Sequence, residues 1–259
     1  LADRYGAERL GEYMADVMNY PDRLMRAALS ELPDGEGYFE DFCDGDGIPD
    51  NADGSDAPFW VRMRVKKFGD RITVDFAGTD AQVAGPMNAP LSVSASGVFC
   101  GLKTAIDPNS LIPPNSGCWR AIEVTAPKGT VVNVEFPAPV VYANHEMSHR
   151  TADMVMGALA EFMPDQVMAC SQGTSAVLTL GGLDPRNGRR YVSYETVKGG
   201  FGARPNKDGI NVVASGISNT MNTPVEVLEM AFPVRVERYE IEPNSGGAGN
   251  VAGDGRCGG

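Results

Sequence analysis

The 259-residue sequence contains only two histidines and two tryptophans, and its acidic residues outnumber its basic ones. Lysine and arginine total 22 against 34 aspartates and glutamates, which gives a formal net charge of −12. The basic residues form no run. Since nucleic-acid backbones and anionic membrane surfaces are bound by clustered basic side chains, we expect neither as a partner. No apolar stretch approaches the roughly 20 residues of a membrane-spanning helix.

The five cysteines are scattered, odd in number and without a Cys-x-x-Cys pair. Such a set does not suit a disulfide framework or a thiolate zinc site, so a reducing cytoplasm is the expected compartment. The phosphate-binding pattern G-x-x-x-x-G-K-[ST] is also missing, so the sequence predicts no nucleotide site of its own. Because the chain begins with Leu1 and ends in Arg-Cys-Gly-Gly, we expect a fragment of a longer subunit.

Hydrophobic residues make up 42% of the chain, which is enough for a sizeable core. Apolar residues recur at helical spacing on either side of Pro21, which predicts two helices, residues 5–18 and 22–32. We expect these helices to form a hairpin packed on a sheet. The predicted domains are residues 1–57, the helical hairpin and an acidic loop, and residues 58–259, a mixed α+β body.

The acidic loop contains enough carboxylates to surround a hard cation such as calcium. The EF-hand register fails, however, because Phe42 stands where the first aspartate ligand belongs and no glutamate closes the loop. A solvated loop is the alternative. The aspartates concerned are Asp41, Asp44, Asp46, Asp50, Asp53 and Asp56.

Alternation of apolar and polar residues predicts several strands, most of them paired as hairpins across glycine-containing turns. The predicted strands cover residues 60–66, 71–76, 121–124, 131–136, 176–180, 191–195 and 233–242. We therefore expect an α+β fold, in which antiparallel sheets carry a helical N-terminal hairpin and one long central helix is packed on the sheets.

The central helix is predicted over residues 144–163, with Asn144 as its N-cap. Its apolar side chains fall on one arc, which we expect to be buried. His145, His149 and Asp153 form a row at four-residue spacing nearly opposite that arc. Core packing does not explain this row, so it should face water, a partner or a site.

The same row begins with His145-Glu146-Met147-Ser148-His149, which matches H-E-x-x-H. In that motif two imidazoles one helical turn apart hold zinc and the glutamate activates its bound water. A third ligand would have to come from elsewhere, and the motif here lies in the first turn of its helix. A zinc hydrolase and a pair of polar histidines at a subunit contact are therefore both open hypotheses.

Two C-terminal segments carry more polar groups than turns require. Asn222 and Glu226 lie in a stretch of amides, hydroxyls and carboxylates at residues 219–229. Ser245, Gly246 and Gly247 begin a glycine loop whose backbone N–H groups could bind an anion. A plain flexible loop is the alternative for the second segment.

Together with motifs along the rest of the chain, these segments resemble the hydantoinase B and 5-oxoprolinase family, including N-methylhydantoinase B. Acetone and acetophenone carboxylase subunits are similar too. The resemblance is carried by Arg4-Tyr5-Gly6, Asp44-Gly45-Asp46-Gly47, Asp75-Phe76-x-Gly78-Thr79, Asn115-x-Gly117, Arg150-x-x-Asp153, Gly199-Gly200-x-Gly202, Asn222-x-Pro224-x-Glu226-x-x-Glu229, the segment from Pro233 to Tyr239, and Ser245-Gly246-Gly247-Ala248-Gly249. Where the family tends to read Arg-Gly-Gly after its glycine loop, this chain has Ala252-Gly253-Asp254.

The resemblance implies one subunit of an ATP-dependent complex that opens a cyclic amide such as a hydantoin or 5-oxoproline. Carboxylation of a ketone is the alternative reaction. ATP would be bound by a separate, hydantoinase A-like partner that passes on an activated intermediate, so a hetero-oligomer is expected. The resemblance also implies a divalent metal whose main ligands lie upstream of Leu1.

Within this scheme Glu226 is the predicted catalytic residue, where it would move a proton. Asn222, Ser245, Gly246 and Gly247 are predicted to bind the substrate, with the glycine amides facing a developing oxyanion or phosphate. His145 and His149 are the candidate metal ligands within the chain. A third hypothesis makes the chain a scaffold for assembly, with the chemistry located elsewhere in the subunit.

Overall fold

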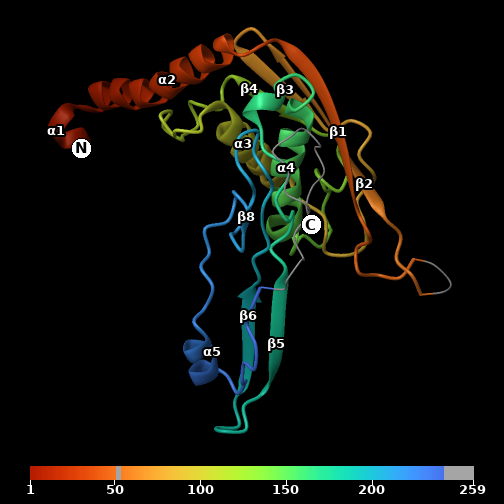
Figure 1. Cartoon of the computed structure of the whole chain (residues 1–259). Helices are drawn as coiled ribbons and strands as arrows, with labels where there is room; N and C mark the ends of the chain where they lie inside the picture. Colours follow the sequence, from red (N-terminus) through yellow and green to blue (C-terminus); the bar gives the residue numbers. More distant parts are fainter. Residues whose placement is uncertain (51–53, 242–259) are drawn as a thin grey trace.

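The computed structural model describes residues 1–50 and 54–241 (Figure 1). Its main sheet has four strands in the order β1-β2-β3-β4. β1 pairs antiparallel with β2 and β2 with β3, whereas β3 and β4 run parallel. The four strands are Gly35–Cys43, Phe59–Phe68, Arg71–Asp75 and Ile122–Thr125. This sheet takes strands from both sides of residue 57.

β2 shows why this sequence forms a sheet with one buried face. Phe59, Val61, Met63 and Val65 are all buried, and they occur at every second position. Side chains alternate between the two faces of a strand, so this spacing turns one apolar face toward the core. The basic residues between them lie on the other face.

One helix packs on the buried face of the sheet, and a second helix packs on the first. α4 (Ser148–Leu159) contacts β1 and β2, and α3 (Leu91–Ile106) packs alongside α4 (Figure 1). The expected apolar arc of α4 is buried: Thr151, Met154, Val155, Ala158 and Leu159 are fully covered. The prediction of an α+β fold with antiparallel sheets and a central helix packed on them is therefore confirmed.

Glycines allow α3 and α4 to approach closely. A Cβ atom at Gly97 would lie 2.5 Å from the backbone oxygen of Ser148, and one at Gly101 would lie 2.6 Å from that of Ala152. Both distances are far below van der Waals contact, so any side chain there would push the helices apart.

The central helix begins differently from the prediction. A π-helical turn, η1 (Ala143–Met147), precedes α4, so Asn144 lies inside the first turn and Tyr142 occupies the N-cap position. The helix ends at Leu159, and a short 3₁₀ turn, η2 (Pro164–Gln166), follows. The start of the helix therefore has a wider backbone turn than an α-helix.

The predicted N-terminal hairpin of two helices is wrong. After the short α1 (Ala2–Tyr5), one helix, α2 (Ala7–Glu31), runs through Pro21 without a break. Proline within a helix removes one backbone hydrogen bond. Here Met25 and Leu29 on the following turns are fully buried, and this packing keeps the chain helical beyond the proline.

Two strand predictions are also wrong. Residues 131–136 form no strand. The expected hairpin between this segment and residues 121–124 is therefore absent, and β4 pairs in parallel with β3 instead. Val131 and Val132 are fully buried in an irregular segment, so their apolar character serves the core and not a strand. The described part of the last predicted strand, residues 233–241, is irregular as well.

Residues 177–196 and 225–231 extend away from the main sheet (Figure 1). The hairpin predicted around the Asn-Gly turn is present as β5 (Val177–Leu183) and β6 (Arg190–Thr196). A second small pair follows, β7 (Gly200–Phe201) with β8 (Ile210–Asn211), and then helix α5 (Val225–Ala231). Within the described residues, no helix combines the length and the apolar character needed to cross a membrane.

The contact between α3 and α4 can be tested with Gly97→Ala. The added methyl group must displace the backbone of α4, so we expect a loss of about 1–3 kcal/mol in the free energy of unfolding, measured by urea denaturation. Gly11→Ala is the matched control, because Gly11 lies in α2 and a Cβ atom added there would have no neighbour within 4 Å. Equal stability of the two variants would contradict the proposed close approach of the helices.

Candidate functional site

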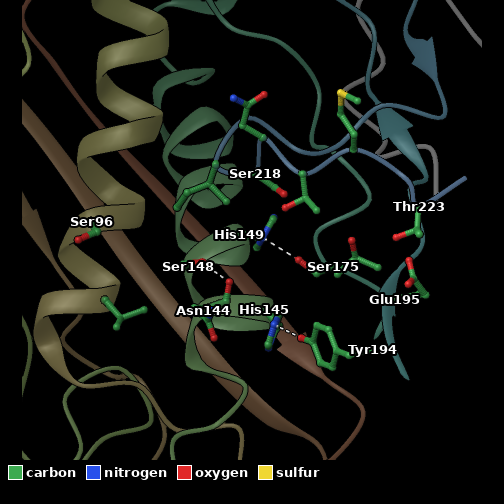
Figure 2. Close-up of a pocket in the computed structure, with 16 residues that line it drawn as sticks. Ser96, Asn144, His145, Ser148, His149, Ser175, Tyr194, Glu195, Ser218 and Thr223 are labelled. Atoms are coloured by element: carbon green, nitrogen blue, oxygen red, sulfur yellow. Dashed lines mark hydrogen bonds between the residues drawn. The ribbon is translucent and has the colours of Figure 1, made fainter. Parts of the chain in front are cut away.

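A pocket of about 520 Å³ lies where the start of the central helix meets β6 and the segment 217–223 (Figure 2). The central helix contributes Asn144, His145 and His149 to its wall, and β6 contributes Tyr194 and Glu195. The pocket therefore joins the packed body of the protein to the extended C-terminal hairpin.

The π-helical turn η1 forms one side of this pocket. Backbone N–H groups of His145 and Glu146 both donate to the carbonyl oxygen of Tyr142, at 3.1 and 2.9 Å. π-helical turns are rare and often occur at functional sites. The backbone oxygen of His145 in turn accepts a hydrogen bond from the N–H of Ser175 at 3.0 Å, which fixes this turn from the opposite side.

His149 is buried, with only 3% of its surface exposed. Its Nε2 lies 3.1 Å from the hydroxyl oxygen of Ser175, and its Nδ1 contacts the hydroxyl of Ser215. Burial lowers the pKa of His149 to about 4, and the nearby His145 and Lys198 contribute to the decrease. The ring is therefore neutral at pH 7, with one nitrogen donating and the other accepting a hydrogen bond. Of the surroundings predicted for this row, water does not apply to His149, because the ring is buried in the wall of the pocket.

His145 contacts the other element of the pocket. Its Nε2 is hydrogen-bonded to the phenolic hydroxyl of Tyr194, and the two rings lie 5.7 Å apart between centroids. Figure 2 shows the two side chains pointing toward each other. Nδ1 of His145 is buried and has no hydrogen-bond partner among the residues that the structure describes. Burial raises the pKa of the Tyr194 phenol, which keeps it protonated.

The zinc hypothesis for H-E-x-x-H meets a specific obstacle in this geometry. Both ring nitrogens of His149 are engaged by serines, so a metal would have to displace one of them. Glu146 accepts a hydrogen bond from the Thr174 hydroxyl at 2.6 Å, and its burial raises the pKa of its carboxyl group. Zinc binding by His145 and His149 stays a prediction.

Within the described ranges, the carboxylates that come close enough together to share a cation lie in the acidic loop and not at the histidines. They are Asp46, Asp50 and Asp56. Asp46 already accepts hydrogen bonds from the N–H groups of Gly85 and Ile48, and Asp56 accepts one from Gly47. These bonds hold the loop together, which gives Asp46 and Asp56 a structural role that needs no ion.

Asp153, the third member of the predicted row, lies one turn beyond His149. It accepts hydrogen bonds from the N–H and the hydroxyl of Ser171 at 3.0 and 2.8 Å. Burial raises the pKa of its carboxyl group to about 6. Arg150 pairs with Asp41 on β1, so Arg150 and Asp153 of the predicted motif support the helix through different partners.

The residues predicted to bind or act on the substrate lie in different parts of the chain. Asn222 lies between two residues of the pocket wall, and its side-chain oxygen is buried without a partner among the described residues. Glu226 is exposed in the first turn of α5. Ser245, Gly246 and Gly247 lie outside the described residues. The roles assigned to all five stay predictions.

Sequence reasoning missed Tyr194, Ser175 and Ser215. Tyr194 lies within the strand predicted over residues 191–195, and its aromatic character suits a strand without indicating a site. The two serines lie in loops 26 and 66 residues beyond His149. No local motif could have connected them with the central helix.

The family model for hydantoinase B/oxoprolinase matches residues 1–256. The chain belongs to this family. It is 34% identical over 258 residues to a protein of Pseudomonas sp. (strain NS671) assigned as a D-/L-hydantoinase subunit, with 98% of this chain and 43% of that protein covered. The beta subunit of the caprolactamase of Pseudomonas jessenii is 31% identical over 261 residues, with the same two shares covered.

Two solved structures have the same fold. The ATP-dependent caprolactamase of Pseudomonas jessenii matches with a TM-score of 0.75 and 30% identity, covering 96% of this chain and 43% of that one. A nucleotide-free acetone carboxylase matches with a TM-score of 0.80 at 16% identity, covering 95% and 34%, and at that identity the likeness concerns the fold alone. The chain thus spans less than half the length of these relatives.

The opposite pKa shifts of His149 and Asp153 give a test by pH. His149 binds its proton more weakly in the folded state, so it makes stability rise with pH between about 4 and 6.5. Asp153 binds its proton more strongly, so it makes stability fall as pH rises between 3.8 and about 6. Each effect is worth about 3 kcal/mol, at about 1.4 kcal/mol per pKa unit, and the two nearly cancel in the native protein.

We therefore expect His149→Gln to lose stability relative to the native protein as pH rises from 4 to 7, whereas Asp153→Asn should gain it. Urea denaturation at several pH values measures both differences, and contributions from the other carboxylates cancel in the comparison. A pH-independent difference for His149→Gln would show that this ring does not change its proton affinity on folding.

Proposed function

We propose that this chain forms part of a subunit of an ATP-dependent cyclic-amide hydrolase. Membership of the hydantoinase B/oxoprolinase family carries the proposal. The names of two relatives, a hydantoinase subunit and a caprolactamase subunit, both refer to enzymes of cyclic amides. The sequence has no phosphate-binding loop, which supports ATP being bound by a hydantoinase A-like partner.

The pocket beside the central helix suits a small cyclic amide. Its volume of about 520 Å³ lies within the usual range for small-molecule sites. Val93, Ile217 and Met221 offer apolar surface for a ring, whereas the hydroxyl of Tyr194 offers a hydrogen bond for an amide. This division of apolar and polar groups is typical of sites that bind small organic molecules.

Exposed apolar surface supports assembly with another subunit. Leu183 and Val192 on the β5–β6 hairpin are about two-thirds exposed, at 67% and 68%. Met14 and Val17, on the half of α2 that extends from the body, are also exposed. A two-stranded hairpin is marginally stable in water, and apolar side chains gathered on a surface indicate interaction sites. We infer that the chain functions in a hetero-oligomer.

A divalent metal is part of the scheme that the resemblance implies. The buried donors at the start of the central helix do not suit one in their present arrangement, because His149 is engaged at both nitrogens. The mechanism proposed for this pocket therefore uses no metal at the histidine pair. The carbonyl oxygen of a cyclic amide, activated by the partner, would be held by hydrogen bonds from pocket side chains.

The first test is turnover by the subunit that carries this chain, purified in complex with its ATP-binding partner. We expect opening of a hydantoin, 5-oxoproline or a lactam only when ATP is present, measured by liquid chromatography of the product. Incorporation of labelled bicarbonate into a ketone would instead identify a carboxylase. Zinc-dependent hydrolysis by the isolated subunit without ATP would support the H-E-x-x-H hypothesis and contradict this proposal.

Glu226 is proposed to move a proton in this reaction, and its exposed position lets it be changed without disturbing the fold. We expect Glu226→Gln to lower turnover about 100-fold or more while leaving the thermal midpoint unchanged. Glu237→Gln, at another exposed acidic residue of the same region, is the control and should keep full activity. Normal turnover of Glu226→Gln would remove this residue from the mechanism and leave its neighbour Asn222 as a binding residue to be tested.

A further inference from the structure

We propose that Tyr194, held in place by His145, donates a proton to the ring nitrogen of the cyclic amide as the carbon–nitrogen bond breaks. The inference rests on the proposed function and assigns a catalytic residue within the pocket. It is carried by three observations: the contact between the two side chains, the Nδ1 of His145 that has no partner among the described residues, and the π-helical turn that holds this histidine.

One of the two side chains belongs to the packed body of the protein and the other to the extended hairpin. His145 is fixed in the packed body, whereas Tyr194 lies on β6 of the extended hairpin and is 48% exposed. Their hydrogen bond lies at the wall of the pocket, which both residues line (Figure 2). A ligand in the pocket can therefore reach the phenolic oxygen of Tyr194.

The buried Nδ1 of His145 indicates which group carries the proton. A neutral imidazole has one N–H, and a buried N–H without an acceptor is rare in proteins. Since Nδ1 has no partner among the described residues, the proton belongs on Nε2. In this tautomer Nε2–H donates to the oxygen of Tyr194. The phenolic proton of Tyr194 is then free to point into the pocket.

The backbone holds His145 in this orientation. The π-helical turn at Ala143–Met147 sets the direction of its side chain, and the hydrogen bond from Ser175 to its backbone oxygen fixes the turn. His149 also lines the pocket, but serine hydroxyls engage both of its ring nitrogens. His149 is therefore poorly placed to exchange a proton with a ligand, and Tyr194 is well placed to do so.

The proposed step conserves atoms and charge. The partner transfers the γ-phosphoryl group of ATP to the amide oxygen, which leaves a C=N bond in the ring and sends the amide proton to solvent. A water molecule adds its hydroxyl group to this carbon and releases its other proton to solvent, while the π electron pair moves to nitrogen, which takes a proton from solvent. The carbon–nitrogen bond then breaks, its electron pair stays on nitrogen, and the nitrogen takes the phenolic proton of Tyr194. Nε2–H of His145 stabilises the resulting phenolate by its hydrogen bond. A proton from solvent restores the phenol. The added hydroxyl group loses its proton to solvent as the carbonyl of an acyl phosphate forms, and a second water splits this product into carboxylate and phosphate, so the reaction consumes two waters and one ATP.

This role predicts that the benefit of Tyr194 depends on the leaving nitrogen. A lactam releases a basic alkyl amine, which needs a proton as it leaves, whereas a hydantoin releases a urea nitrogen, which needs one much less. For Tyr194→Phe in the complex with the ATP-binding partner, we expect kcat to fall about 100-fold with a lactam and less than about 10-fold with a hydantoin. The KM values should change little.

Two further variants separate chemistry from structure. Tyr191→Phe is the matched control, because Tyr191 lies on the other face of β6, where its ring packs against Phe232 at 6.0 Å between centroids. It should keep full activity on both substrates. His145→Gln, which can still donate one hydrogen bond, should lower lactam turnover less than Tyr194→Phe does. Thermal midpoints of all three variants identify any that fail to fold.

The outcomes distinguish this inference from the proposed function. An active native complex whose Tyr194→Phe variant loses equal activity on both substrates, or none, would overturn the role of Tyr194 and leave the proposed function intact. A native complex that opens no cyclic amide with ATP would overturn both. A selective loss on the lactam, with ATP hydrolysis continuing without ring opening, supports proton donation by Tyr194.

Discussion

The close packing of α4 against both its neighbours is the constraint on which the rest of the structure depends. On one side Gly97 and Gly101 bring α3 to the backbone of α4, and on the other side Gly37 of β1 does the same at Ala158. Backbone in contact with backbone leaves little freedom for α4 to shift or rotate. The position of the helix start, and with it the histidines of the pocket, is fixed as a result.

That fixed helix carries polar groups that would otherwise be costly to bury. A buried polar group without a partner loses free energy relative to water, and a buried charge loses more. His149 avoids this cost by staying neutral between Ser175 and Ser215, and Asp153 is held by Ser171. The same contacts attach the loops after α4 to the helix, so they build the wall of the pocket as well as satisfying the histidine and the aspartate.

The pocket joins a rigid part of the protein to a part that lacks a core of its own. The β5–β6 hairpin buries few side chains and presents apolar ones, whereas α4 is packed on both sides. Tyr194 is on the hairpin and His145 is on the helix, so the contact between them forms only when the hairpin lies in this position relative to the helix. A partner that covers the hairpin would therefore also set the geometry of the pocket.

Local pattern was enough to predict much of this architecture. Alternation in β2, the Asn-Gly turn between β5 and β6, and the apolar arc of α4 each predicted an element that the structure contains. Local pattern failed where packing overrides it. Pro21 remains within a helix because Met25 and Leu29 are buried beyond it, and the apolar residues Val131 and Val132 enter the core without forming a strand.

The sequence by itself determined the family, the acidic charge, the apolar face of the central helix and the polar row on its other side, because all of these depend on residue identity and spacing. Only the tertiary structure decided which side chains contact that row. Ser175, Ser215 and Tyr194 reach the two histidines from segments 26 to 66 residues away. Contacts of that kind depend on how the loops and the hairpin return to the helix, and no periodicity within one segment encodes them.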